Sequence, residues 1–275
     1  MENIDFNKIK CLILDIDNTL TNTKREITDY TREIISKTVK KGIYVVLCTG
    51  RTNQYAIKSS KYCHGSPIVV VDNGALIYNY ALNKVYFSMS ISKQLSQRIF
   101  EICLDNEVDC VFNAINARYR CKQTMNRFLS NIETIDSLDD INEIITQIVV
   151  SSEEETRVQA CYDLIKNIKE VEINNTSLGT NAARDYAFLD VNIPGISKGL
   201  AIQKLMEILN ISNEEIMCFG DSINDKSMFE VCKYSVALKN AEKSLKNKAY
   251  MITEYDNDED DNVLKVALES KKMMI

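Results

Sequence analysis

The sequence predicts an α/β protein with a doubly wound parallel sheet, interrupted by an α+β insert. Three short, continuously apolar runs near the N-terminus predict strands buried on both faces, as the strands of a parallel sheet are. Segments with helical spacing of apolar residues lie between these runs, and the same alternation returns in the last third of the chain. The middle of the chain instead has the pattern of consecutive hairpins with packed helices.

The N-terminal third has the order strand–helix–strand–helix–strand. Strands are expected at residues 10–16, 43–48 and 68–71, and helices at 28–41 and 52–63. Thr28 is a suitable N-cap for the first helix, because its hydroxyl can accept a hydrogen bond from a free backbone N–H of the first turn. Gly42 stands where a helix commonly ends in a left-handed residue.

The last third repeats the alternation, and the middle does not. C-terminal helices are expected at 198–209, 225–232 and 241–248, and strands at 216–219, 234–238 and 250–253. In the middle, the pattern predicts a hairpin at 75–87, helices at 92–106 and 153–169, and strands or extended segments at 108–112, 117–122, 144–151, 171–174 and 187–192. We therefore expect a core domain of residues 1–80 and 186–275, and an insert domain of residues 81–185.

Composition narrows the classes of function. The 275 residues carry a formal net charge of −6, with 45% apolar and 26% charged side chains, which is typical of a globular protein. Nucleic acid is an unfavourable partner for an acidic chain without a long basic run. We find no apolar stretch of membrane-spanning length and no signal peptide, so we expect a cytoplasmic protein without a membrane partner. Nothing in the sequence indicates an obligate protein partner.

The cysteines and the single histidine argue against zinc binding, a disulfide framework and histidine-based catalysis. Nine scattered cysteines without a CxxC pair indicate reduced core thiols, and make a zinc site or disulfide framework an unfavourable interpretation. His64 is the only histidine, and a loop position explains it best. We therefore expect any catalysis to depend on carboxylates.

Two of the chemically informative segments contain paired acids after a predicted strand. Asp15-Ile16-Asp17-Asn18-Thr19 follows the first strand, and Gly220-Asp221-Ser222-Ile223-Asn224-Asp225 follows a C-terminal one. Ligands of open α/β sheets bind beyond the carboxyl ends of strands, and clustered carboxylates suit Mg²⁺. The structural alternatives are a solvated turn for the first segment and a helix N-cap for the second.

The other two segments suit an anion. Thr49-Gly50-Arg51 follows the second strand, where a hydroxyl and a glycine would let backbone amides approach a phosphate. Lys198 stands in the first turn of a helix, where the helix dipole disfavours a cation unless an anion is close by. An ordinary turn and an exposed lysine are the alternatives. Each segment alone is a weak signal, but a single parallel sheet would bring all four to one edge.

In this order the four segments resemble the motifs of the haloacid dehalogenase superfamily. More narrowly, the chain is similar to the Cof-like phosphatases with a type II, subtype B cap. VVDNGALIY at 70–78, LDVNIPGISKGLAI at 189–202 and MCFGDSINDKSMFEVCKYSVALKNA at 217–241 resemble their characteristic segments. The resemblance extends over essentially the whole chain. Asn18 departs from it, because that subfamily usually has glycine there.

The resemblance implies a Mg²⁺-dependent phosphatase acting on a small phosphorylated metabolite, with sugar phosphates expected first. Asp15 would be the nucleophile that forms an aspartyl-phosphate, and Asp17 the general acid and base. The metal set it implies is Asp15, the Asp17 carbonyl and Asp221, with Asp225 acting less directly. Phosphate would be bound by Thr49, Gly50, Lys198 and Asn224.

The insert would act as a cap that chooses the substrate. Candidate substrate contacts are Asn73, Arg118, Arg120 and Arg184, although an arginine on a cap is more often a solvated surface residue. Two other functions stay open at this point. One is a phosphomutase or other phosphotransferase on the same core, and the other is a non-enzymatic sensor of a phosphorylated ligand.

Overall fold

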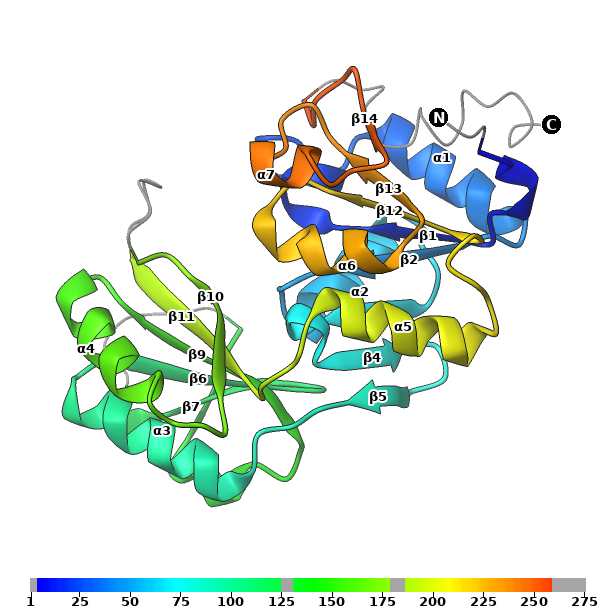
Figure 1. Ribbon diagram of the computed structural model, residues 1–275. Coiled ribbons are helices and arrows are strands. Elements are labelled where there is room, and N and C mark those ends of the chain that lie inside the picture. The colour runs from blue at the N-terminus through cyan, green and yellow to red at the C-terminus, as the bar shows by residue number, and fades with distance from the viewer. Residues whose placement is uncertain (1–3, 125–130, 179–185, 259–275) are drawn as a thin grey trace. The chain divides into compact units, whose positions relative to one another are not determined.

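The computed structural model describes residues 4–124, 131–178 and 186–258, which form two units that each contain a sheet (Figure 1). One unit comprises Met1–Phe87 and Ser197–Ile275, and the other comprises Ser88–Ile196. Arg184 lies outside the described residues. No helix within the described part of the chain is long and apolar enough to cross a membrane.

The first unit has an eight-stranded sheet in the order β14-β13-β12-β1-β2-β3-β4-β5. The strands are β1 (Cys11–Leu14), β2 (Tyr44–Cys48), β3 (Ile68–Val71), β4 (Leu76–Asn79), β5 (Lys84–Ser88), β12 (Ile216–Gly220), β13 (Tyr234–Ala237) and β14 (Met251–Ile252). β1 pairs in parallel with both β2 and β12. The chain proceeds outward from β1 in one direction and from β12 in the other, so a topological switch point lies between these two strands.

Helices on both faces explain the continuous burial of the central strands. They are α1 (Asp29–Lys40), α2 (Asn53–Tyr62), α5 (Lys198–Leu209), α6 (Lys226–Val231) and α7 (Lys243–Lys246). Cys11 and Ile13 of β1 share an apolar cluster with residues of α5 and α6. Figure 1 shows α1 on the opposite side of the sheet from α5 and α6. Because side chains alternate between the two faces of a strand, the side chains on each face of β1 have helices to pack against.

The predicted cap of the first helix is confirmed. The Thr28 hydroxyl accepts a hydrogen bond from the Thr31 N–H at 3.2 Å. Gly42 has φ +82°, so it ends the helix in the left-handed region, as its position predicted. α7 is shorter than expected: it covers the four residues Lys243–Lys246, whereas we predicted a helix over 241–248.

The second unit has a six-stranded sheet in the order β10-β11-β9-β6-β7-β8. Its strands are β6 (Asp109–Ala114), β7 (Arg118–Cys121), β8 (Glu133–Ile135), β9 (Ile145–Ser152), β10 (Glu172–Thr176) and β11 (Ala187–Asn192). Helices α3 (Lys93–Asp105) and α4 (Glu155–Ile165) contribute to its apolar cluster. β8 had no sequence signal, because its three residues are not an apolar run. α4 ends four residues before the predicted end.

The division between the units falls later along the chain than expected at both crossings. We placed the first boundary after residue 80, but β4 pairs with β3 and β5 extends the same sheet, so the first unit continues to Phe87. We placed residues 187–192 in the core, but β11 pairs with β9 and β10 of the second sheet. A buried apolar run predicts a strand without indicating which sheet it joins.

A close approach between α5 and α6 requires glycine at position 199. A Cβ added to Gly199 would lie 2.3 Å from the Ser227 backbone oxygen. The Gly199 N–H also donates to the Ser227 hydroxyl at 3.1 Å. This packing places the N-terminus of α5, and therefore Lys198, beside the turn that precedes α6.

We expect Gly199→Ala to lower the free energy of unfolding by about 2 kcal/mol, because the added methyl group meets backbone rather than a movable side chain. Chemical denaturation would measure the change. Gln203→Ala, at an exposed position of the same helix, is the control and should be nearly neutral. Equal stability of the Gly199 variant and the wild type would contradict the close packing.

Candidate active site

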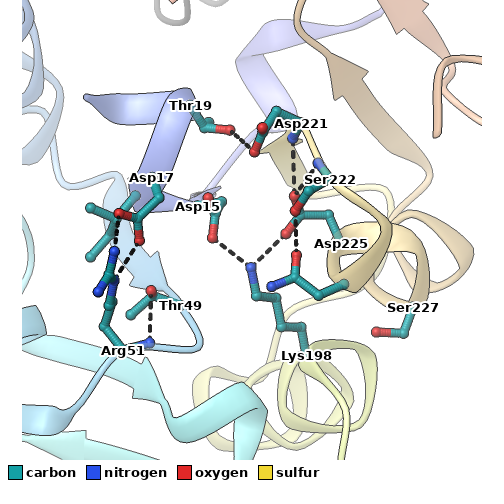
Figure 2. A network of polar contacts seen from close by, with 12 residues as sticks. Asp15, Asp17, Thr19, Thr49, Arg51, Lys198, Asp221, Ser222, Asp225 and Ser227 are labelled. Atoms are coloured by element: carbon teal, nitrogen blue, oxygen red, sulfur yellow. Dashed lines mark hydrogen bonds and ion pairs between the residues drawn. The ribbon is translucent and has the colours of Figure 1, made fainter. Parts of the chain in front are cut away.

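The four chemically informative segments meet at the carboxyl edge of the first unit's sheet. Asp15 follows β1, Thr49 follows β2 and Asp221 follows β12. Lys198 begins α5, whose N-terminus faces the same edge (Figure 2). The site therefore spans the switch point between β1 and β12, where open α/β sheets bind ligands.

A buried lysine joins two of the acids. The Lys198 Nζ lies 2.5 Å from Asp15 Oδ1 and 2.5 Å from Asp225 Oδ1. The lysine side chain is 1% exposed, so its charge depends on these two partners. Burial lowers the pKa of Lys198, but the two carboxylates raise it by more, so the pKa lies above its usual value. The lysine that the helix dipole disfavours thus has the anionic neighbours that its position predicted.

Negative charge exceeds positive charge in this cluster. Oxygens of Asp15, Asp221 and Asp225 lie within 4.8 Å of one another. Burial, followed by the charge of Asp225, raises the pKa of Asp221 to about 7. Burial is also the main cause that raises the pKa of Asp15. Three carboxylates with one ammonium group therefore fit a divalent cation, which would favour their ionised forms.

Two of these acids are oriented by local hydrogen bonds. Asp225 Oδ2 accepts hydrogen bonds from the backbone N–H groups of Asp221 (3.0 Å) and Ser222 (3.1 Å). Both Asp225 oxygens are therefore used within the protein, because Oδ1 contacts Lys198. The Thr19 hydroxyl donates to Asp221 Oδ1 at 3.2 Å. Sequence reasoning assigned Thr19 no role, since nothing in the sequence links residues so far apart.

Asp17 lies on the other side of Asp15 and has a different partner. Its two oxygens accept hydrogen bonds from Arg51 Nε at 2.9 Å and Nη2 at 2.8 Å, as Figure 2 shows. The Asp17 side chain is 34% exposed, whereas that of Asp15 is 7% exposed. Asn18 follows with φ +55° and ψ 7°. Asparagine tolerates this left-handed conformation better than most residues, so it suits the position where the resemblance implied glycine.

The Thr49 loop has a hydroxyl that is available to donate. Thr49 Oγ1 accepts a hydrogen bond from the Arg51 N–H at 3.1 Å, so its own proton can be directed to a ligand. Gly50 is closely packed, because a Cβ there would lie 2.6 Å from Asn73 Oδ1. Asn73 follows β3 and is 4% exposed, and its N–H donates to the Thr49 oxygen at 3.3 Å. The structure therefore places Asn73 directly behind this loop.

Asn224 lies in the loop of the C-terminal acids. Its Oδ1 accepts a hydrogen bond from the Ser222 hydroxyl at 2.7 Å, and the residue is half-buried. This contact leaves the amide nitrogen as the donor that a bound anion could use.

Arg118 and Arg120, the two proposed arginine contacts among the described residues, belong to the second unit. Arg120 is buried and forms an ion pair with buried Asp109 at 3.2 Å, which favours a structural role. Arg118 is half-buried and donates from Nε to Asn113 Oδ1 at 3.0 Å. This ion pair has no local sequence signal, because Asp109 and Arg120 lie on different strands.

Comparison with known proteins gives matches over most of the chain. The family model of haloacid dehalogenase-like hydrolases matches residues 12–266. A 5-amino-6-(5-phospho-D-ribitylamino)uracil phosphatase, YcsE of Bacillus subtilis (strain 168), is 29% identical over 257 residues, covering 94% of each chain.

Solved structures share the fold. A haloacid dehalogenase-like hydrolase from Bacteroides thetaiotaomicron has a TM-score of 0.83 at 22% identity, covering 95% of this chain and 99% of its own. The subclass IIB sugar phosphatase BT4131 has a TM-score of 0.74 at 23% identity, covering 96% and 99%. The α/β core with an inserted α+β domain is therefore the fold of both.

We expect the metal-free protein to lose stability between pH 5 and pH 8. A carboxyl group whose pKa is raised by folding binds more protons in the folded state, so stability falls as pH rises from about 4, the unfolded pKa of Asp, towards the folded pKa. Asp221 has a folded pKa of about 7, and that of Asp15 is also raised. Denaturation in the presence of a chelator would measure the free energy of unfolding at both pH values.

Asp221→Asn should reduce this loss, because it removes one titrating carboxyl group. Asp105→Asn, an exposed position on α3, is the matched control and should leave the pH dependence unchanged. If stability were constant over this range, or if both variants behaved alike, the charge excess described above would be contradicted.

Proposed function

Because the chain belongs to the family of haloacid dehalogenase-like hydrolases, we propose that it is a Mg²⁺-dependent phosphatase that forms an aspartyl-phosphate intermediate. The observation that carries this proposal is the meeting of Asp15, Lys198 and the Asp221–Asp225 loop at one switch point. A surplus of buried carboxylates beside a buried ammonium group is costly for folding alone. Phosphoryl transfer would use each of these groups.

Asp15 is the nucleophile in this proposal. One of its oxygens would attack the phosphorus in line with the leaving oxygen, which forms a new P–O bond as the ester bond breaks. Lys198 contacts Asp15 Oδ1 and would offset the charge between the carboxylate and the entering phosphate. The aspartyl-phosphate would then be hydrolysed by water.

The donor set fits magnesium because it consists of hard oxygens with excess negative charge. The carboxylates of Asp15 and Asp221 and the main-chain carbonyl of Asp17 would hold the ion, with Asp225 acting through its neighbours. When bound, Mg²⁺ would neutralise charge that develops on the transferred phosphoryl group.

Asp17 is the proposed general acid and base. It would protonate the leaving oxygen and later accept a proton from the attacking water. Its greater exposure suits this role, because a leaving group must reach it from outside the buried cluster. Arg51 donates one hydrogen bond to each Asp17 oxygen, and because a carboxylate oxygen has two lone pairs, each keeps a site that a proton could occupy.

Thr49, the Gly50 N–H, Lys198 and Asn224 would bind the phosphoryl oxygens. The available Thr49 proton and the Asn224 amide nitrogen support this assignment. For the rest of the substrate, we propose a small phosphorylated metabolite, with sugar phosphates first. The ribityl phosphate in the name of the Bacillus relative supports a polyol phosphate of this kind. Arg118 and Asn73 stay proposed contacts, and Arg120 is the weaker one because of its ion pair.

Replacing Asp15 with Asn should abolish turnover and leave the fold intact, because the amide is isosteric but is not a nucleophile. Phosphate release with Mg²⁺ would measure activity, and circular dichroism would check the fold. We expect a loss of at least about 10³-fold, while Asp105→Asn should retain wild-type activity. An Asp15→Asn variant with full activity would overturn the assignment.

Phosphate release from a panel of phosphorylated sugars, nucleotides and p-nitrophenyl phosphate should require a divalent cation. We expect a chelator to remove activity and added Mg²⁺ to restore it, because the carboxylate cluster needs a cation to accept a phosphate. Phosphate transfer to a sugar hydroxyl without release would indicate a phosphotransferase. Ligand binding without any turnover would indicate a sensor.

A further inference from the structure

We propose that Asn240, Asn257 and Asp258 are positioning residues that hold the loop bearing Asp15 and Asp17 in its active conformation. We call these three residues the loop clamp. They touch no atom that takes part in the proposed reaction, and their effect on catalysis rests on the proposed function.

The loop clamp contacts the backbone of the loop at three residues. Asn240 Nδ2 donates to the Asn18 carbonyl at 3.0 Å, and Asn257 Nδ2 donates to the Thr21 carbonyl at 3.2 Å. Asp258 Oδ1 accepts from the Thr23 N–H at 2.7 Å and from the Thr23 hydroxyl at 2.8 Å. These contacts join residues 222 to 236 positions apart in the sequence.

Other parts of the chain hold this loop mainly near its start. It leaves the sheet after Leu14, forms a short irregular turn at Ile16–Leu20 and reaches α1 at Asp29. Thr21 contacts Ile16 and Asn22 contacts Glu26, but these hydrogen bonds lie within the loop itself. They shape the loop without fixing it to the rest of the unit. Side chains near the start of the loop contact Lys198, Arg51 and Asp221. The clamp adds attachment of the loop backbone over residues 18–23 to a further part of the chain.

The contact of Asn240 with Asn18 lies where a displacement would affect two proposed functional residues at once. The Asn18 carbonyl belongs to the peptide group that joins Asn18 to Thr19. Asp17 precedes this peptide, and Thr19 holds Asp221 through its hydroxyl. A shift of this peptide group would therefore move the proposed acid and a proposed metal ligand together.

The clamp residues are attached to the opposite side of the switch point. The Leu238 N–H donates to the Gly220 carbonyl, and the Glu242 N–H donates to the Asp221 carbonyl. The Lys239 N–H donates to Tyr255, which ties the segment of Asn240 to that of Asn257 and Asp258. Through these hydrogen bonds the clamp connects the loop after β1 to the end of β12, where the loop of Asp221 begins.

Asp258 allows a decisive substitution. Only one of its oxygens accepts the hydrogen bonds from Thr23, and these bonds hold the pKa of Asp258 below its usual range. Asp258→Asn keeps an oxygen at the same place, whereas Asp258→Ala removes it. Asn240→Asp is the complementary change, because it keeps the shape and removes the N–H donor to Asn18.

We expect Asp258→Ala and Asn240→Asp to lower kcat about tenfold, because small displacements of catalytic groups are costly, with KM within about twofold of wild type. Asp258→Asn should restore most of the activity. Glu254→Gln, at an exposed position of the same segment, is the control and should match the wild type. Activity would be measured with Mg²⁺ and the best substrate of the panel, and thermal unfolding would be recorded for each variant.

A second readout does not depend on catalysis. Lys24 and Arg25 lie exposed in the clamped loop, so trypsin reports its local opening. Cleavage there should be faster in Asp258→Ala and Asn240→Asp than in the wild type, Asp258→Asn or Glu254→Gln. Mass spectrometry of the fragments would identify the cut.

The outcomes separate this inference from the proposed function. A wild type without phosphatase activity would refute the function, and the trypsin experiment would still test the clamp. Unchanged cleavage and unchanged kcat in both disruptive variants would overturn the clamp. A fall in kcat that follows a general loss of thermal stability, without rescue by Asp258→Asn, would also overturn it.

Discussion

The contact of one buried ammonium group with two carboxylates is the constraint on which the rest of the site depends. Lys198 reaches both Asp15 and Asp225 from the first turn of α5, where the helix dipole does not favour a cation. Such a charge is tolerated in the interior only when partners surround it. Its place therefore fixes how α5, β1 and β12 meet. The glycine at 199 has the same origin, because the lysine can enter the cluster only if the helix approaches Ser227 closely.

The parallel core was accessible from the sequence because each of its parts leaves a local signal. Continuous apolar runs indicated the strands at 10–16, 43–48 and 68–71, and the Thr28 cap and Gly42 marked the ends of a helix. The approximate meeting of Asp15, Thr49, Lys198 and Asp221 followed from the rule that parallel strands end at one edge. The pairing of individual side chains had no such local signal. The pairings of Thr19 with Asp221, Arg51 with Asp17 and Arg120 with Asp109 are set by side-chain directions in three dimensions.

The boundaries between the units were less accessible for a related reason. β11 has the same apolar character as the core strands, but its hydrogen bonds lie in the second sheet. Conversely, the hairpin of β4 and β5 leaves the parallel pattern and still extends the first sheet. Burial selects for apolar residues wherever a strand lies, so composition cannot assign a strand to one sheet or the other. The ion pair of Arg120 was inaccessible for the same reason, because a buried ion pair has no local sequence pattern.

The excess of carboxylates has a consequence for the order in which ligands arrive. With all three acids ionised, their charge exceeds that of Lys198 by two, since three negative charges face one positive charge. A phosphate dianion that enters this cluster alone meets repulsion in a region where burial weakens the screening by water. A divalent cation that enters first would cancel this excess of two negative charges. Under the proposed function, the site would therefore bind the metal first and the anion second, and the apparent affinity for the anion would depend on the metal concentration.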